Sequence, residues 1–263
     1  MGKFFDSIPP EMLAWIQKQQ CFWVATAPLK ATGHVNVSPK GAPDCFRIID
    51  NSTVWYEDLS GSGCETIAHI RENGRVTIMF MAFEGAPRIL RLFGTGTVHE
   101  FDTPEYNALI PAESRNPGSR AVIMINIYKV GTSCGYAVPY YEFLGHRELL
   151  HSMATRKENF DCAAPAPTYH HDKGLKIYWE GHNAKSLDGL PALLNAGKSS
   201  VAFNSSDNWR ARTVDAKSVK NLSLKKEQGS VETRKREEWK LVGAFSAGVL
   251  VTAVCMKYIG SRA

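Results

Sequence analysis

Seven short segments with strand character follow one another at close intervals over residues 22–130, and this spacing constrains the fold more than any other feature. Each is rich in β-branched or aromatic residues and is bounded by Gly, Pro, Asn or Asp, which is typical of antiparallel hairpins. The segments are Phe22–Ala27, His34–Ser38, Phe46–Ile49, Thr53–Glu57, Arg75–Phe83, Arg88–Val98 and Ala121–Val130. Because few helical stretches separate them, we expect a mainly β fold, a closed or nearly closed antiparallel β-barrel.

Short helices are expected around these strands. A leading helix should have Pro9 and Pro10 in its first turn, which tolerates proline, and another short helix should start at Thr103-Pro104-Glu105. Ser62 and Glu65 fit the S-x-x-E capping box at the start of a third helix. Further along, residues 147–157 fit a helix, and residues 174–194 fit a short strand and a turn.

The length of 263 residues and the hydrophobic content of 44% allow one sizeable core with an appended segment. We expect a barrel domain over residues 1–160 and a C-terminal extension of it over residues 161–197. Residues 198–240 are rich in Ser, Lys, Asn and Glu and predict a polar, basic linker. Residues 241–259 differ sharply from this linker in composition.

The segment Leu241–Ile259 predicts a C-terminal hydrophobic helix. Lys257 is its one charged residue, and a helix of this length would reach ~28 Å at ~1.5 Å per residue, which suits a single membrane span. Basic residues precede it and favour a tail anchor with the barrel in the cytoplasm: Arg234, Lys235, Arg236 and Lys240. The alternative is a helix packed on the barrel. Glycines at 243 and 248 favour the anchor, and the target membrane stays open.

Several classes of function are disfavoured by composition. The formal charge of +5 is modest, and its cationic excess lies in the polar region after residue 209, so we expect no nucleic-acid binding. The six cysteines form no CxxC pair, so neither a zinc site nor a thioredoxin-type motif is predicted. The first twenty residues lack the pattern of a secretory signal, which agrees with a reducing, intracellular compartment.

The stretch GSG at Gly61–Gly63 lies between a strand and a helix. Two glycines let the backbone approach a bulky group, and the following helix would aim free N–H groups at an anion. A phosphate also favours hydroxyl groups and a cation, which Ser62, Thr66, Lys40 and an arginine could supply. The alternative is a plain surface turn.

In this order, the segments VNVSPKG, VWYEDLSGSGCETIAHIRENGRVTIMFMAF and PRILRLFGTGTV resemble the flavin-binding split barrel of the pyridoxamine 5'-phosphate oxidase superfamily, in its uncharacterised oxidase-like branch. The match runs from about Phe22 to about Tyr141. The resemblance implies an antiparallel split β-barrel that holds FMN between the two subunits of a homodimer.

The resemblance also implies which residues contact the flavin. The strand that ends in Lys40 would lie along the isoalloxazine ring, beside a pair that begins at Trp55. The turn from Gly61 and the helix start at Thr66 would lie beside the phosphate, and the strand of Arg91 would add further contacts. The matching positions are Asn36, Val37, Ser38, Lys40, Trp55, Tyr56, Gly61, Ser62, Gly63, Thr66, Arg88 and Arg91.

The sequence departs from the authentic oxidase at defined positions. That enzyme has an Arg-Lys pair where this chain has Glu65-Thr66, and a glutamine where it has Ile89. Its C-terminal Arg-Leu-His-Asp-Arg motif, which holds the vitamin substrate, is absent from the sequence. We therefore do not expect pyridoxamine phosphate to be the substrate.

Three functions remain open. The first is an FMN-dependent oxidoreductase acting on an unknown small molecule, with an unknown electron acceptor. The second is a non-catalytic module that binds flavin, a deazaflavin or haem. The third is a membrane-attached dimeric interaction protein. Cys134, in TSCGYAVPYYEF, is either a nucleophile or a small residue at a strand end, and no catalytic residue is assigned.

Overall fold

The computed structural model describes residues 2–220 and Lys240. The chain divides into two compact units, residues 1–214 and residues 215–263. In the second unit, Asp215 accepts a hydrogen bond from the backbone N–H of Ser218 at 2.7 Å. The expected tail anchor, residues 241–259, lies outside the described residues. Within residues 2–220, no helix combines the length and the apolar character needed to cross a membrane.

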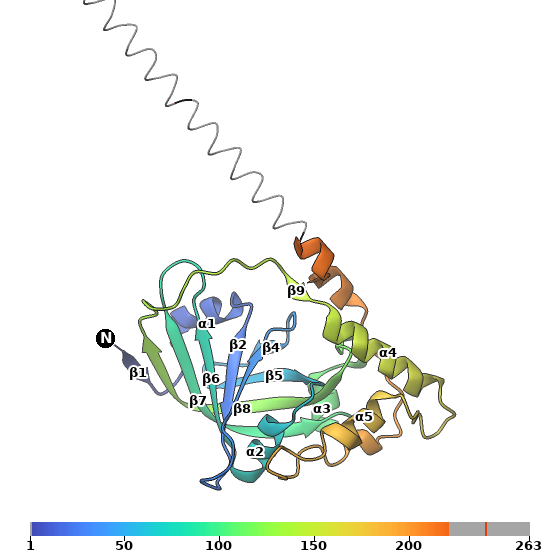
Figure 1. Ribbon diagram of the computed structural model, residues 1–263. Coiled ribbons are helices and arrows are strands. Elements are labelled where there is room, and N and C mark those ends of the chain that lie inside the picture. Colours follow the sequence, from blue (N-terminus) through green and yellow to red (C-terminus); the bar gives the residue numbers. More distant parts are fainter. Residues whose placement is uncertain (1, 221–239, 241–263) are drawn as a thin grey trace, which may run out of the picture. The chain divides into compact units, whose positions relative to one another are not determined.

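The first unit is built on an antiparallel sheet that curls into a barrel (Figure 1). The strand order is β3-β2-β6-β7-β8-β5-β4, and β1 pairs with the end of β8. The strands are β1 (Lys3–Phe5), β2 (Phe22–Thr26), β3 (Asn36–Lys40), β4 (Phe46–Ile48), β5 (Thr53–Leu59), β6 (Arg75–Met81), β7 (Ile89–Glu100) and β8 (Ser119–Ser133). All seven expected strands are therefore present, and the mainly β, antiparallel prediction is confirmed.

Helices cover the ends and one side of the barrel. Figure 1 shows α1 and α2 near opposite ends of the strands, with α3, α4 and α5 grouped on one side. The helices are α1 (Pro10–Gln17), α2 (Glu65–Asn73), α3 (Pro104–Leu109), α4 (Leu149–Ala163) and α5 (Leu175–His182), with 3-10 turns η1 (Ala112–Ser114), η2 (Ala196–Lys198) and η3 (Asn208–Arg212). A small parallel pair, β9 (His146–Arg147) and β10 (Thr213–Val214), completes the unit.

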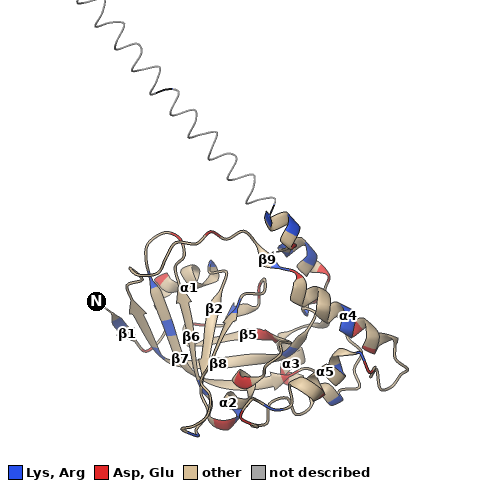
Figure 2. Cartoon of the chain, in the orientation of Figure 1, with Lys and Arg blue, Asp and Glu red and all other residues tan. Residues whose placement is uncertain are grey.

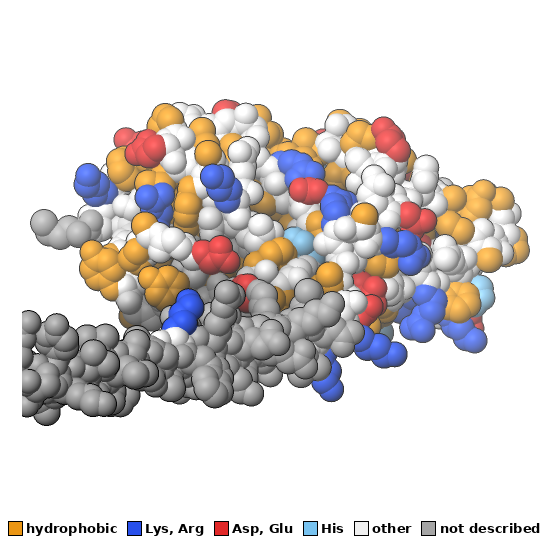
Figure 3. Space-filling view, turned by 90° about the horizontal axis from the view of Figure 1, so that it is seen from above, with side chains coloured by type: hydrophobic (Ala, Val, Ile, Leu, Met, Phe, Trp, Pro, Cys, Tyr) orange, Lys and Arg blue, Asp and Glu red, His pale blue; other side chains and the backbone are white. Residues whose placement is uncertain are grey.

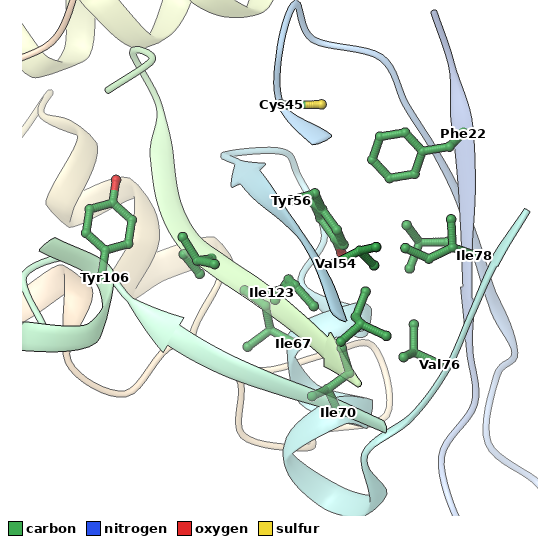
Figure 4. Close-up of a cluster of buried hydrophobic side chains, with 14 of the residues drawn as sticks. Phe22, Cys45, Val54, Tyr56, Ile67, Ile70, Val76, Ile78, Tyr106 and Ile123 are labelled. Carbon is green, nitrogen blue, oxygen red and sulfur yellow. The ribbon is translucent and has the colours of Figure 1, made fainter. Parts of the chain in front are cut away.

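The core fills the barrel through strand alternation. In β6, Val76, Ile78 and Phe80 are buried while the intervening residues are half-buried or exposed. Figure 4 shows Val76 and Ile78 among the side chains of neighbouring strands. Gly96 lets α2 approach β7, because a Cβ there would lie 2.9 Å from Cδ1 of Ile70.

Three buried carboxylates attach the C-terminal part of the unit to the barrel. The first is Glu100, at the end of β7, which accepts the backbone N–H groups of Leu194, Asn195 and Ala196 at 2.8, 2.7 and 2.7 Å. The same carboxylate forms an ion pair with Arg71. A strand end of the barrel therefore supplies the acceptor that orders the turn before η2.

The second carboxylate is Glu158 of α4, which forms an ion pair with Arg115 at 2.8 Å while both side chains are at most 3% exposed. The Arg115 guanidinium also lies 4.9 Å from the ring centroids of both Phe101 and Phe203. The two rings also contact each other at 5.1 Å, so this cluster ties a residue of the expected linker, Phe203, to the barrel.

The third carboxylate, Asp161, accepts N–H groups from Leu175 and Lys176 at 2.7 and 3.1 Å and so satisfies the first turn of α5. The expected short strand in this region is wrong, because residues 175–182 are helical.

The expected domain end at residue 160 falls inside α4. Residues 198–214 of the expected linker belong to the first unit, where Trp209 is buried.

Charged side chains are distributed unevenly over the elements of the fold. Figure 2 shows mostly tan strands that carry scattered basic side chains, and β5 carries acidic ones. On the face seen in Figure 3, side chains of both charges are interspersed with hydrophobic ones. A buried acidic group in a barrel strand therefore needs a specific explanation.

Candidate functional site

Lys40, Asp58 and Arg120 meet where the two ends of the sheet approach each other. Nζ of Lys40 on β3 lies 2.8 Å from Oδ1 of Asp58 on β5, and Nε of Arg120 on β8 lies 2.8 Å from Oδ2. β4 pairs only with residues 54–56 of β5, so at Asp58 the strand β5 is itself the edge of the sheet. The ion pair therefore closes the barrel seam with side chains.

This group carries more positive than negative charge. Burial alone would raise the pKa of Asp58, but Arg120 and Lys40 together lower it to about 2, so the carboxylate is ionised at neutral pH. Two cations thus face one carboxylate. Nη1 of Arg120 is buried and has no hydrogen-bond partner among the described residues. A buried, unpartnered guanidinium N–H is costly in a folded protein unless a ligand satisfies it.

A row of hydrogen-bonding groups continues from Lys40 along β3. Nδ2 of Asn36 donates to Oγ1 of Thr66 at 2.9 Å and lies 3.3 Å from Oγ1 of Thr26. The hydroxyl of Ser38 donates to Oδ1 of Asn36 at 2.9 Å. We call the seven residues of the row and the ion-pair group the seam site: Thr26, Asn36, Ser38, Lys40, Asp58, Thr66 and Arg120.

His69 lies behind this row. Its Nδ1 is 3.0 Å from Oγ1 of Thr26, and its Nε2 is buried without a partner among residues 2–220. Burial lowers the pKa of His69, which outweighs the opposite effect of Asp188 and nearby glutamates. The imidazole is therefore neutral at pH 7 and does not add to the positive charge of the seam site.

The glycine turn before α2 is covered by the C-terminal extension. The carbonyl of Gly61 accepts from the hydroxyl of Tyr178 at 3.3 Å and from Nδ2 of Asn183 at 3.1 Å. Ser60 accepts from the indole N–H of Trp179 at 2.6 Å. The carbonyl of the turn is thus held by the extension, whereas the side chain of Ser62 is exposed.

The expected capping box is wrong. Helix α2 begins at Glu65 with Cys64 at its N-cap, and no side chain caps it. The Glu65 carboxylate accepts instead from the backbone N–H of Leu187 at 3.2 Å. Gly63 allows this, because a Cβ there would lie 2.3 Å from Oε2 of Glu65. The N–H groups of the first turn of α2 consequently receive no side-chain cap.

The remaining expected contacts are not gathered at the seam site. Arg91 lies on the outer face of the sheet with Met79 and Trp23, to which the register joins it, whereas Lys40 points inward. Nη1 of Arg91 lies 3.3 Å from Oγ of Ser133. Arg88 precedes β7, and its guanidinium lies 5.4 Å from the ring centroid of Trp15 and contacts Met12.

The aromatic pair also separates. Tyr56 is fully buried and its ring packs 5.5 Å from that of Phe22, so it presents no surface to a ligand (Figure 4). Trp55 points to the opposite face of β5, as strand alternation requires. Val37 is 60% exposed on the outside of the barrel. The structure therefore brings together Asn36, Ser38, Lys40 and Thr66 from the expected set.

Sequence reasoning missed Thr26, Asp58 and Arg120. A signal for Asp58 was present, because an acidic pair, Glu57-Asp58, interrupts an otherwise apolar strand. Arg120 is the second residue of β8, directly before its most apolar run, and is only 3% exposed. Each is unusual on its own, but their pairing depends on the β5–β8 register.

No group of three or more His, Cys, Asp or Glu residues with the arrangement of a metal site occurs among the residues that the structure describes. Cys134 is exposed just after the end of β8.

A curled antiparallel barrel with a cationic seam defines a split-barrel protein. The profile of the family described as pyridoxamine 5'-phosphate oxidase matches residues 8–134. A pyridoxamine 5'-phosphate oxidase family protein of Aspergillus flavus, ustO, is 39% identical over 213 residues, which cover 77% of this chain and 82% of the relative. The chain belongs to the pyridoxamine 5'-phosphate oxidase family, as the resemblance predicted.

Solved structures show further similarity at lower levels. HupZ of Group A Streptococcus is 28% identical over 47% of this chain and 91% of its own, with a TM-score of 0.38. An FMN-binding protein of Syntrophomonas wolfei subsp. wolfei is 12% identical over 46% of this chain and 81% of its own, with a TM-score of 0.34.

Proposed function

We propose that this protein binds FMN and acts as an oxidoreductase on an unknown small molecule. The observation that carries the proposal is the unpartnered Nη1 of Arg120 in a seam site where two cations face one carboxylate. Family membership supports a flavin as the group that meets this charge. A phosphate is the part of FMN that such a site favours.

The residues present fit a phosphate group. Lys40 is 21% exposed and keeps donors beyond the one given to Asp58. Thr66 accepts from Asn36, so its own O–H remains available to donate. The uncapped first turn of α2 adds backbone N–H groups at the positive end of a helix. The Glu65 carboxylate, which accepts from the N–H of Leu187 on the extension, opposes this attraction.

Bound FMN would supply the electron transfer, as flavins do in such enzymes. The chain's own residues would bind the phosphate, orient the ring through β3 and limit access through the extension. Tyr178 and Asn183 fix the carbonyl of Gly61, so the turn is held in place before any ligand binds. We do not propose pyridoxamine phosphate as the substrate, because the motif that holds it is absent.

We further propose a homodimer in which the outer face of β2, β6 and β7 is shared between two copies. Trp23, Phe83 and Tyr141 form a chain of ring contacts on this side, at 6.0 and 5.1 Å, and Tyr141 remains 60% exposed. An apolar face of this kind is typical of a dimer contact. Light scattering of the full chain in detergent tests it, and a clean monomer at micromolar concentration would contradict the shared-site arrangement.

The experiment for FMN uses the full chain and three ligands. Titrating FMN should quench its fluorescence with a Kd below about 50 µM, which is roughly 6 kcal/mol of binding. Lys40→Ala should raise the Kd for FMN about tenfold and that for riboflavin by less than about twofold, because a charge-assisted contact to the phosphate is lost. Lys30→Ala, an exposed lysine outside the seam site, is the matched control.

Haem is the third ligand, because the alternative function is a non-catalytic module that could bind haem in place of flavin. Absence of quenching with FMN, together with a Soret shift on adding haem, would overturn the flavin assignment. If FMN binds, turnover with NAD(P)H and an added acceptor separates an oxidoreductase from a flavin-binding module.

A further inference from the structure

A cavity of about 540 Å³ lies at the end of the barrel near α1, apart from the seam site. It is bounded by α1, by the segment between β3 and β4, and by the small β9–β10 pair. None of the seven seam-site residues lines it. Its volume is in the range of sites that take small molecules.

The floor of the cavity is aromatic and apolar. The rings of Phe22, Phe46 and Phe80 contact one another at centroid distances of 5.0, 5.2 and 5.7 Å. Phe22 and Phe80 are buried, whereas Phe46 and Ile48 are half-buried and line the cavity. The floor therefore offers ring faces and edges to a flat apolar group.

Cys45 contributes to the same apolar wall. Burial, together with the charge of Glu57, raises the pKa of its thiol to about 12. The thiol is therefore neutral and unreactive at physiological pH, and the cavity offers binding surface rather than a nucleophile.

The rim of the cavity is cationic. Its charged lining residues are Arg47, Arg212 and Asp44, which leaves one positive charge in excess. Arg212 forms an ion pair with Asp44 and donates through Nε to the carbonyl of Asn208 at 3.3 Å. A guanidinium has five N–H donors, so Arg212 keeps donors for an anionic group of a ligand.

The β9–β10 pair contacts the loop that forms this rim. Its residue His146, paired in register with Thr213, donates from Nδ1 to the carbonyl of Gly41 at 2.7 Å. This bond fixes the proton on Nδ1 and leaves Nε2 as an acceptor. Arg212, directly before β10, holds Asp44, whose φ of 54° is in the left-handed region that a non-glycine residue seldom adopts. One contact from β9 and one from the end of η3 thus keep a strained loop over an aromatic floor.

We propose that this cavity is a second ligand site, which binds a planar aromatic compound that carries a carboxylate. The ring lies on Phe22, Phe46 and Phe80, and the carboxylate accepts from Arg212 at the rim. The proposal does not rest on the flavin proposal: the cavity shares no residue with the seam site, although Lys40 pairs in register with Phe22 of its floor.

The test uses 2-naphthoate as the probe and the full chain, by isothermal titration. Binding should be measurable below millimolar concentration, and 2-naphthamide, which lacks the charge, should bind about tenfold more weakly. Arg212→Gln should raise the Kd for 2-naphthoate about tenfold. Arg210→Gln is the matched control, since Arg210 lies on the same turn η3, is exposed, and does not line the cavity.

A second variant addresses the floor. Ile48→Trp should fill part of the cavity and abolish binding of both probes, with its melting temperature recorded alongside. The proposal is overturned if the unaltered chain does not bind 2-naphthoate at millimolar concentration, or if Arg212→Gln and Ile48→Trp both bind within twofold of it. It is also overturned if FMN displaces 2-naphthoate, because the probe would then occupy the flavin site.

Discussion

Nζ of Lys40 lies 2.8 Å from Oδ1 of Asp58, and this pair joins β3, at one end of the sheet order, to β5, the strand next to the other end. Asp58 is fully buried and also holds Arg120. Asp58→Ala should lower the free energy of unfolding by about 3–5 kcal/mol, because it leaves a buried guanidinium without its counter-charge. Urea unfolding measures this. Asp207→Ala, which removes an exposed ion pair with Arg210, should cost less than about 1 kcal/mol, and equal losses would contradict the role of the seam.

The burial of His151 predicts that the free energy of unfolding falls in mild acid. It is buried, stacks on Trp209 at 5.4 Å, and has its pKa lowered to about 4 by burial, with smaller effects from Arg212 and His146. The unfolded chain binds a proton near pH 6.5 and the folded one does not, so stability falls as pH drops from about 6.5 to about 4, by on the order of 3 kcal/mol. His151→Phe should flatten this slope in urea melts at a series of pH values. An unchanged slope would mean that another group titrates.

Thr66 and Ser62 differ in what they offer to a phosphate. Thr66→Val keeps the shape and removes the free O–H, so the Kd for FMN should rise about tenfold. Ser62→Ala removes an exposed hydroxyl that caps nothing, and its Kd should change by less than about twofold. Flavin fluorescence titration distinguishes them, and the reverse order would place the phosphate on the glycine turn.

Truncation tests the boundary of the first unit. A chain ending at residue 160 cuts α4 and removes Asp161, η2 and the three backbone N–H groups that Glu100 accepts, so we expect it to be insoluble or to lack a cooperative thermal transition. A chain ending at Val214 should melt cooperatively. Circular dichroism during heating measures both. Equal melting temperatures would show that the extension contributes nothing to stability.

The tail anchor stays a prediction from sequence. The full chain and a version ending at Glu238 are expressed, and membranes are extracted with alkaline carbonate. Retention of the full chain and release of the shorter one is the expected result, since a mostly apolar segment of nineteen residues with one charge matches the thickness of a bilayer. Equal release would assign the segment to the soluble part of the protein.

The strands were predictable because their signals are local. Alternation in Val76, Ile78 and Phe80, and glycine or proline between segments, needs no knowledge of the partner strand. Helix α2 was located for the same reason, but its cap was not. The Glu65 carboxylate accepts the N–H of Leu187, 122 positions away, in place of the capping contact. No local sequence pattern indicates this alternative donor.

The seam site and α5 show the opposite case. Asp58 and Arg120 are 62 positions apart and meet only through the β5–β8 register. Residues 175–182 contain Ile177, Tyr178 and Trp179, which favour strands, yet they form a helix because Asp161 accepts the N–H groups of its first turn. Tertiary contacts outweighed propensity at this point.

Glu100 ends a barrel strand and receives three backbone N–H groups from residues 194–196. Unfolding of the extension would leave the Glu100 carboxylate without its three backbone hydrogen bonds. Fraying of β7 would remove the acceptor that orders the turn before η2. Local unfolding of either the extension or β7 therefore has a high free-energy cost while the other stays folded. Residues 1–214 should consequently show one calorimetric transition with equal van't Hoff and calorimetric enthalpies, and amide exchange in α5 should be as slow as in β7.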